Sequence, residues 1–227
     1  MKTLHVAILQ FPGTNCEYDT VYAFRRLGHE TTLLWHKEEK LPEGIDLVVV
    51  PGGFSYGDYL RAGSIARFSP VMKAVQAYAD EGGKVLGICN GFQILTEARL
   101  LPGALKRNRN LHFISKIQHL KVVSTDNAFL NRCETGEVLS IPIAHADGNY
   151  YIDDKSLEEM ERNGQILLRY CDAEGNPEVV NGSVRQIAGI CNKEKNVFGL
   201  MPHPERAMES ILGSQDGVRM LEGFGAV

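Results

Sequence analysis

A cysteine stands at the centre of the segment Val85–Leu95, which reads VLGICNGFQIL. Gly87 and Gly91 flank Cys89 two residues away on each side, so the segment fits the pattern G-x-C-x-G. This pattern is the thiol form of a nucleophile elbow, a tight turn from a strand into a helix that exposes a reactive side chain. The N-terminus of the following helix favours the thiolate, the reactive form of cysteine. The pattern therefore predicts that Cys89 is a nucleophile.

A cysteine nucleophile needs a base, and two of the seven histidines are candidates. His203 lies between two prolines in LMPHPERA, which favour an extended backbone, and Glu205 is two residues further on. Side chains at i and i+2 of an extended segment project to the same side, so the carboxylate can orient the imidazole. His145, in PIAHADGNY, is the alternative base, or else it lines the pocket or a partner interface. The remaining histidines are interpreted as core, surface or sheet residues: His5, His29, His36, His112 and His119.

Acyl transfer also needs hydrogen-bond donors for the oxyanion that forms on the substrate. Gly52 and Gly53 follow an apolar run directly, where backbone N–H groups can approach a substrate carbonyl. The N–H of Asn90, next to the cysteine, is the second expected donor, and we group Gln93 with these substrate-binding candidates. The loop FSYGDYLRAG continues with side chains suited to a pocket rim or an interface: Tyr56, Asp58 and Arg61.

Three short apolar runs are predicted to be strands, at Leu4–Gln10, Asp46–Val50 and Lys84–Ile88. They lack polar alternation, which is typical of parallel strands buried on both faces. Helices are expected over Cys16–Leu27 and from Pro70 up to the Gly-Gly pair at 82–83. The alternation predicts an α/β fold with a mostly parallel, doubly wound sheet flanked by helices. Ligands bind such sheets at the carboxyl ends of the strands, where the loops FPGTNC, PGGFSYGDYLRAG and CNG lie.

The pattern changes between about residues 105 and 184, where longer and partly alternating runs predict an additional antiparallel strand region. One helix is expected near Lys155–Asn163 and a final helix near Ser214. A hairpin is expected around Asn192–Asn196. The sequence contains no linker, repeat or low-complexity tract, so we interpret residues 1–227 as a single domain.

Composition and charge argue against several classes of function. The net charge is −4 and no long Lys/Arg run occurs, which disfavours binding to nucleic acid or to a membrane surface. The number of cysteines is odd, at five, and no pair has C-x-x-C spacing, which argues against a disulfide framework and a metal centre. We interpret the four cysteines other than Cys89 as buried packing residues. Without a signal peptide or an apolar stretch of about 18 residues, the sequence favours a cytoplasmic protein.

Taken together, the motifs G-x-C-x-G, H-P-E and P-G-G resemble those of class I, triad-type glutamine amidotransferases. Four longer segments resemble the glutaminase subunits of phosphoribosylformylglycinamidine synthase: PGGFSYGDYLRAGSIAR, GICNGFQIL, PIAHADGNYY and GLMPHPERA. The segment FPGTNCEYD resembles the opening of those subunits, with Thr14 and Glu17 where Ser and Asp are expected. The resemblance runs nearly from end to end.

The resemblance implies a mechanism in which Cys89 attacks the side-chain amide of L-glutamine, His203 protonates the departing ammonia, and Glu205 orients His203. It also implies that ammonia passes to a synthetase subunit, which uses ATP to make formylglycinamidine ribonucleotide in purine biosynthesis. ATP and Mg²⁺ are then expected on that partner, with no cofactor in this chain, and a small accessory subunit is expected to join them. The sequence has no G-x-x-x-x-G-K-[ST] loop, which agrees with such a division.

Two alternatives stay open at this point. One is a freestanding cysteine amidohydrolase or peptidase on the same fold, which releases its product to water. The other is a binding partner that keeps the fold without the chemistry. Glutaminase assays with and without a synthetase partner separate these alternatives.

Overall fold

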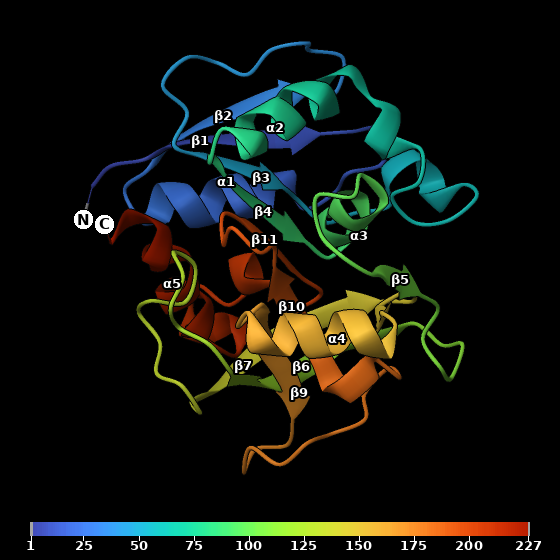
Figure 1. Ribbon diagram of the computed structural model, residues 1–227. Helices are drawn as coiled ribbons and strands as arrows, with labels where there is room; N and C mark the ends of the chain where they lie inside the picture. The colour runs from blue at the N-terminus through green and yellow to red at the C-terminus, as the bar shows by residue number, and fades with distance from the viewer. Residues whose placement is uncertain (1, 227) are drawn as a thin grey trace.

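The computed structural model of the protein describes residues 2–226 (Figure 1). The helices are α1 (Glu17–Arg26), α2 (Pro70–Asp80), α3 (Asn90–Glu97), α4 (Asp154–Arg162) and α5 (Asp216–Glu222). The strands are β1 (His5–Gln10), β2 (Glu30–Trp35), β3 (Leu47–Val50), β4 (Lys84–Ile88), β5 (Ala104–Lys106), β6 (Ile114–Val122), β7 (Val138–His145), β8 (Asn149–Tyr151), β9 (Ile166–Cys171), β10 (Ile187–Cys191) and β11 (Val197–Leu200).

The described residues form a nine-stranded sheet in the order β2-β1-β3-β4-β11-β10-β9-β6-β7, and β5 and β8 form a separate pair. The strands from β2 to β11 are parallel to one another. From β11 to β7 every neighbouring pair is antiparallel. Helices α1, α2 and α3 pack on the parallel part, whereas α4 lies beside the antiparallel part (Figure 1). The predicted α/β fold with an antiparallel region is thus confirmed.

Local sequence signals explain where the elements begin and end. All four residues of β3 are buried, as expected for an apolar strand covered on both faces. Pro70 opens α2 at a position where its missing N–H is not needed. Asp153 caps α4 by accepting a hydrogen bond from the backbone N–H of Ser156 at 3.0 Å. The predicted helices and the hairpin of β10 and β11 therefore lie within about two residues of their expected positions, close to the usual variation in assigned helix ends.

The centre of the sheet brings distant parts of the chain together. Strand β4 pairs with β3 on one side and with β11 on the other. Gly87 lies opposite Val50, and Ile88 lies opposite Leu200. The three loops that follow β3, β4 and β11 consequently leave the sheet at the same edge.

The two ends of the described chain also lie side by side (Figure 1), and the N–H of Lys2 donates to the carbonyl of Gly225 at 3.1 Å. None of the helices formed by residues 2–226 combines the length and apolar character that crossing a membrane requires.

Candidate active site

Cys89 occupies the turn between β4 and α3 in a strained backbone conformation. Its φ is +52° and its ψ is −107°, and a positive φ is uncommon for a residue other than glycine. The N–H of Cys89 still donates to Leu200 at 2.8 Å, as a strand residue would, while its carbonyl accepts the first helical bond from Gln93 at 3.1 Å. The chain thus changes from strand to helix at one residue, which is the turn that the G-x-C-x-G pattern predicts.

Gly91 explains why this turn needs glycine. A Cβ added at Gly91 would stand 1.8 Å from the carbonyl oxygen of Val50, far inside van der Waals contact. Helix α3 can therefore begin this close to β3 only because residue 91 has no side chain. The tight approach places the N-terminus of α3 directly at Cys89.

His203 and Glu205 form a buried pair at the end of β11. The His203 Nδ1 atom lies 2.7 Å from a Glu205 carboxylate oxygen, and each residue is 2% exposed. The expectation of an extended segment was wrong, because Pro204–Arg206 forms a 3₁₀ turn with Pro204 in its first position. Proline suits the first turn of a helix as well as an extended chain. The turn brings the carboxylate back to the imidazole and so produces the predicted contact by a different backbone route.

The charges around His203 favour its protonated form. Burial alone would lower the pKa of His203, but the charges of Glu205 and Cys89 raise this pKa well above its usual value. Within residues 2–226, the His203 Nε2 atom has no hydrogen-bond partner. With Nδ1 occupied by Glu205, Nε2 is the nitrogen left to exchange a proton with Cys89. The arrangement suits a thiolate–imidazolium pair.

Gly52 lies where the two parts of this pair meet. A Cβ at this position would stand 2.8 Å from Cε1 of His203 and 3.4 Å from Cβ of Cys89. At Gly53, a Cβ would stand within 2.9 Å of the backbone of residues 13–15. The packing of the protein itself thus excludes a side chain at both glycines, and the role of their N–H groups in an oxyanion hole stays a prediction.

Asn90 and Gln93 join the loops around the cysteine. The Asn90 amide donates to Gln93 at 2.9 Å and accepts from the backbone N–H of Ser55 at 3.0 Å. Gln93 in turn donates to the carbonyl of Asp147 at 2.7 Å. Both side chains are thus engaged within the chain. The backbone N–H of Asn90 belongs to the first turn of α3, where N–H groups have no partner inside the helix.

The Asp58 side chain lies at the edge of this network. The Asn90 amide approaches an Asp58 carboxylate oxygen at 3.4 Å. Burial, with a further contribution from Asp147, raises the pKa of Asp58 to about 6. The site therefore contains a carboxyl group that changes charge just below neutral pH.

The other two rim candidates bond elsewhere in the chain. The Tyr56 hydroxyl lies 2.9 Å from Nδ1 of His36 and 3.1 Å from Oγ of Ser69. His36 is buried by this cluster, so its interpretation as a surface or sheet residue was wrong. Arg61 forms a two-pronged ion pair with Glu97, with both N–O distances at 2.6 Å. Tyr56 and Arg61 thus anchor the loop that follows β3.

His145 is buried and held at the end of β7. Its Nδ1 atom lies 3.1 Å from the Asn108 side-chain oxygen, and it is 2% exposed. Burial, with a further contribution from His203, lowers the pKa of His145 to about 4, so the ring is neutral at physiological pH. The carbonyl of the preceding Ala144 lies 3.7 Å from the Cys89 sulfur. This environment suits a wall of the site, and it favours His203 as the base.

Cys16 lies at the site as well, which its interpretation as a packing residue missed. Its sulfur is 3.0 Å from the point that a Gly52 Cβ would occupy. Cys16, His203 and Glu205 each offer one polar atom, and these atoms lie within 4.8 Å of one another. Such spacing could hold a metal ion, but the Arg206 guanidinium 3.2 Å from the sulfur opposes a cation there. The available signal was the loop FPGTNC after β1, because β1 lies beside β3 in the parallel sheet.

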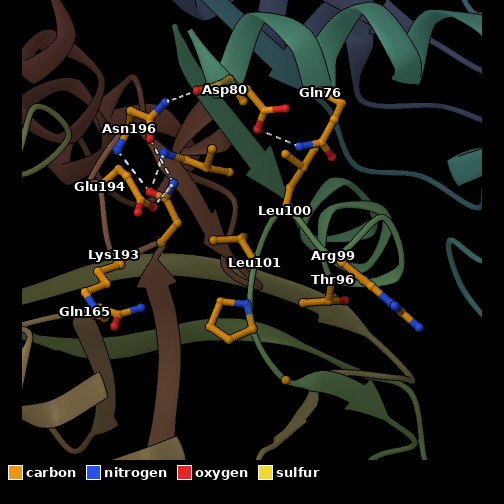
Figure 2. A pocket seen from close by; sticks show the side chains of 15 residues that line it. Gln76, Asp80, Thr96, Arg99, Leu100, Leu101, Gln165, Lys193, Glu194 and Asn196 are labelled. Carbon is orange, nitrogen blue, oxygen red and sulfur yellow. Dashed lines mark hydrogen bonds between the residues drawn. The ribbon is translucent and has the colours of Figure 1, made fainter. Parts of the chain in front are cut away.

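A cavity of about 670 Å³ lies apart from this site (Figure 2). Its lining includes Asp80, at the end of α2, and Asn196, just before β11. Asn196 donates to the carbonyl of Gly83, so this wall lies at the amino ends of β4 and β11. Cys89 follows the opposite end of β4. The cavity therefore belongs to the other edge of the sheet.

Comparisons with known proteins agree with the site. Residues 3–217 match the model of the CobB/CobQ-like glutamine amidotransferase domain. The chain is 66% identical to the phosphoribosylformylglycinamidine synthase subunit PurQ of Sulfurimonas denitrificans, over 97% of this chain and 99% of that protein. It is 56% identical to the subunit of the same name from Campylobacter jejuni, over 97% of this chain and 96% of that protein.

Solved structures give the same result. A chain of PurLQS from Thermotoga maritima superposes with a TM-score of 0.88 at 40% identity, covering 98% of both chains. A glutamine amidotransferase from the same organism, at 19% identity and a TM-score of 0.58 over 90% of this chain and 77% of that one, shares the fold. The resemblance found in the motifs is confirmed. The chain belongs to the class I glutamine amidotransferases, in the family of the PurQ subunits of phosphoribosylformylglycinamidine synthase.

Proposed function

We propose that this chain hydrolyses L-glutamine to glutamate and ammonia and delivers the ammonia to a synthetase subunit. The synthetase uses ATP to convert formylglycinamide ribonucleotide to formylglycinamidine ribonucleotide, a step of purine biosynthesis. The relatives at 52–66% identity that carry the name of this synthase support the proposal. The observation that carries the chemistry is the strained Cys89 facing a His203–Glu205 pair across Gly52.

In the first half-reaction, the Cys89 thiolate attacks the side-chain carbonyl carbon of glutamine. The N–H groups of Asn90 and of the Gly52–Gly53 loop stabilise the oxyanion. His203 gives its proton to the nitrogen, which leaves as ammonia, and a thioester to Cys89 forms. Glu205 keeps the imidazole oriented and balances its charge throughout.

In the second half-reaction, His203 takes a proton from water, and the resulting hydroxide attacks the thioester carbon. Collapse of the tetrahedral intermediate breaks the C–S bond and releases glutamate. Cys89 returns as the thiolate and His203 as the imidazolium. The two steps need no group beyond the triad, the oxyanion donors and water.

The wider setting is part of the same proposal. ATP and Mg²⁺ bind to the synthetase subunit, a small accessory subunit completes the assembly, and the enzyme works in the cytoplasm. The described residues of this chain act as one domain, since a single sheet joins the parallel and the antiparallel parts.

The substitution Cys89→Ala tests the division of labour. In the assembled enzyme it should abolish the glutamine-dependent synthesis and leave the ammonia-dependent synthesis intact, because ammonia bypasses the thioester. A glutamine-like electrophile should label the wild-type chain at Cys89 alone, as mass spectrometry of the digested chain would show. Full glutaminase activity in Cys89→Ala, or equal loss of both activities in a correctly assembled complex, would contradict the proposal. High glutaminase activity of the isolated chain, unchanged by the synthetase, would favour the freestanding hydrolase.

A further inference from the structure

Cys16 is surrounded by polar groups although it is buried. It is 2% exposed, and its thiol donates to the side-chain oxygen of Asn15 at 3.1 Å. The Arg206 guanidinium donates to its sulfur from 3.2 Å. Burial raises the pKa of Cys16, so the sulfur carries its proton at neutral pH and can donate and accept at the same time. A cysteine that merely fills space would not need two polar contacts.

The group that holds this sulfur is itself fixed. The Arg206 Nε atom donates to an Asp19 carboxylate oxygen at 3.0 Å, and Asp19 lies in the first turn of α1. Arg206 directly follows Glu205 in the chain. Helix α1 and the 3₁₀ turn Pro204–Arg206 are thereby tied together through Arg206, with Cys16 between them.

The sulfur and the imidazole both border the space that Gly52 leaves open. Cε1 of His203 and Sγ of Cys16 lie 2.8 and 3.0 Å from the position of a Gly52 Cβ. Cε1 is the ring carbon between the two nitrogens, and in an imidazolium its hydrogen is positively polarised. A sulfur lone pair on this side favours the charged ring in one orientation.

We propose that Cys16 is a positioning residue for His203. Cys16 restrains the ring on its Cε1 side and Glu205 restrains it at Nδ1, so that Nε2 stays free for Cys89. The proposal rests on the proposed function, since it assigns a role within the same site. The buried Nε2 atom, which has no hydrogen-bond partner among the described residues, supports the proposal. Nothing bonded to Nε2 fixes the ring, so other contacts must keep this nitrogen directed toward Cys89.

The protonation of His203 should respond to Cys16. Burial lowers the pKa of His203, while Glu205, Cys89 and then the contact with Cys16 raise it. The titratable and charged groups that the structure places around the ring are Glu205, Cys89, Cys16, Arg206 and His145. If the active pair contains protonated His203, removing the Cys16 contact moves the alkaline limb of the pH profile to lower pH.

The test compares Cys16→Ala and Cys16→Ser in the assembled enzyme, with Cys133→Ala as the matched control. Cys133 is also buried, and burial together with Glu137 raises its pKa to about 11. The assay measures kcat and kcat/KM for glutamine from pH 6 to 10 in the presence of a chelator, and ammonia-dependent synthesis reports assembly. Cys16→Ala should lower kcat about 3- to 10-fold, the contribution of one hydrogen bond, and move the alkaline limb. Cys16→Ser should recover part of both, and Cys133→Ala should change neither.

Unmoved profiles and unchanged kcat in both Cys16 variants would overturn the proposal. If Cys16→Ala fails to assemble, the same pH profile is measured for Arg206→Lys. Lysine keeps the positive charge but cannot donate to the Asp19 carboxylate and the Cys16 sulfur at the same time. An unmoved limb in that variant also counts against the proposal. Cys89→Ala is measured alongside. Glutaminase activity in Cys89→Ala would refute the proposed function itself. If Cys89→Ala is inactive but Cys16→Ala behaves like the wild type, only the positioning role is refuted.

Discussion

The substitution Glu205→Gln changes the charge of the proposed triad and very little else. Glutamine has nearly the shape of glutamate, and its side-chain oxygen can still accept the hydrogen bond that the carboxylate receives from His203 over 2.7 Å. Both residues are 2% exposed, so water cannot replace the lost charge. The buried imidazolium then loses the counter-charge of Glu205, and burial favours the neutral ring. The reduced supply of protonated His203 should slow the departure of ammonia.

The magnitude follows from the role of the carboxylate. Loss of an orienting acid or of an acid–base group lowers rates about 10²- to 10⁴-fold, which corresponds to about 3–5.5 kcal/mol of transition-state stabilisation. We expect glutamine-dependent kcat/KM to fall within this range in Glu205→Gln, while the ammonia-dependent rate stays at the wild-type level. Glu174→Gln, which changes an exposed carboxylate, serves as the control.

Stability adds a second readout with a definite sign. The pKa of His203 is raised above 6.5 in the folded chain, so its interaction with Glu205 stabilises the fold fully below pH 6.5. This contribution is lost as the pH rises through the folded-state pKa. Thermal unfolding from pH 6 to 9 should therefore show a decline in the wild type that is absent in Glu205→Gln. Near-normal glutaminase activity, or an unchanged decline in stability, would refute the reasoning.

Three further outcomes follow from contacts described above. Gly91→Ala should lower the free energy of unfolding in urea by about 1–3 kcal/mol or more, because its Cβ would stand 1.8 Å from the Val50 oxygen. For Asp58, burial and then Asp147 raise the pKa from 3.8 to about 6. The wild type should therefore lose stability between pH 4 and 6 as this carboxyl ionises, and thermal melts of Asp58→Asn should lack that decline. Tyr56→Phe removes two hydrogen bonds of the loop after β3 and should lower unfolding stability by about 1–3 kcal/mol, measured by chemical denaturation.

The sequence predicted those parts of the site that depend on neighbouring residues. The elbow at Cys89 needs only a buried strand, two glycines and a helix start, all within Val85–Leu95. Glu205 could be assigned to His203 because they are two residues apart, although the backbone between them is a 3₁₀ turn. The contact was predicted, whereas the backbone conformation that produces it was not.

The missed parts depend on strand order and register. Cys16 reaches His203 because β1 lies beside β3 and because Arg206 pairs with Asp19, 187 residues away in the chain. Single-sequence patterns specify which segments are strands but not which strands become neighbours. For the same reason, the sequence indicated a pocket role for Asp58 but not the nearby carboxylate of Asp147 that helps to raise its pKa.

The position of β11 has a consequence for biosynthesis. This strand fills the gap between β4 and β10, yet it is translated after both of them. A ribosome-bound chain that ends before Val197 exposes two unpaired edges, which can join wrong partners or other nascent chains. The same chain carries Cys89 but lacks both Leu200, which accepts the Cys89 N–H, and His203, so nitrogen release cannot start before these residues are made. The strand that completes the sheet and the residue that completes the proposed triad are therefore supplied by the same late segment of the chain.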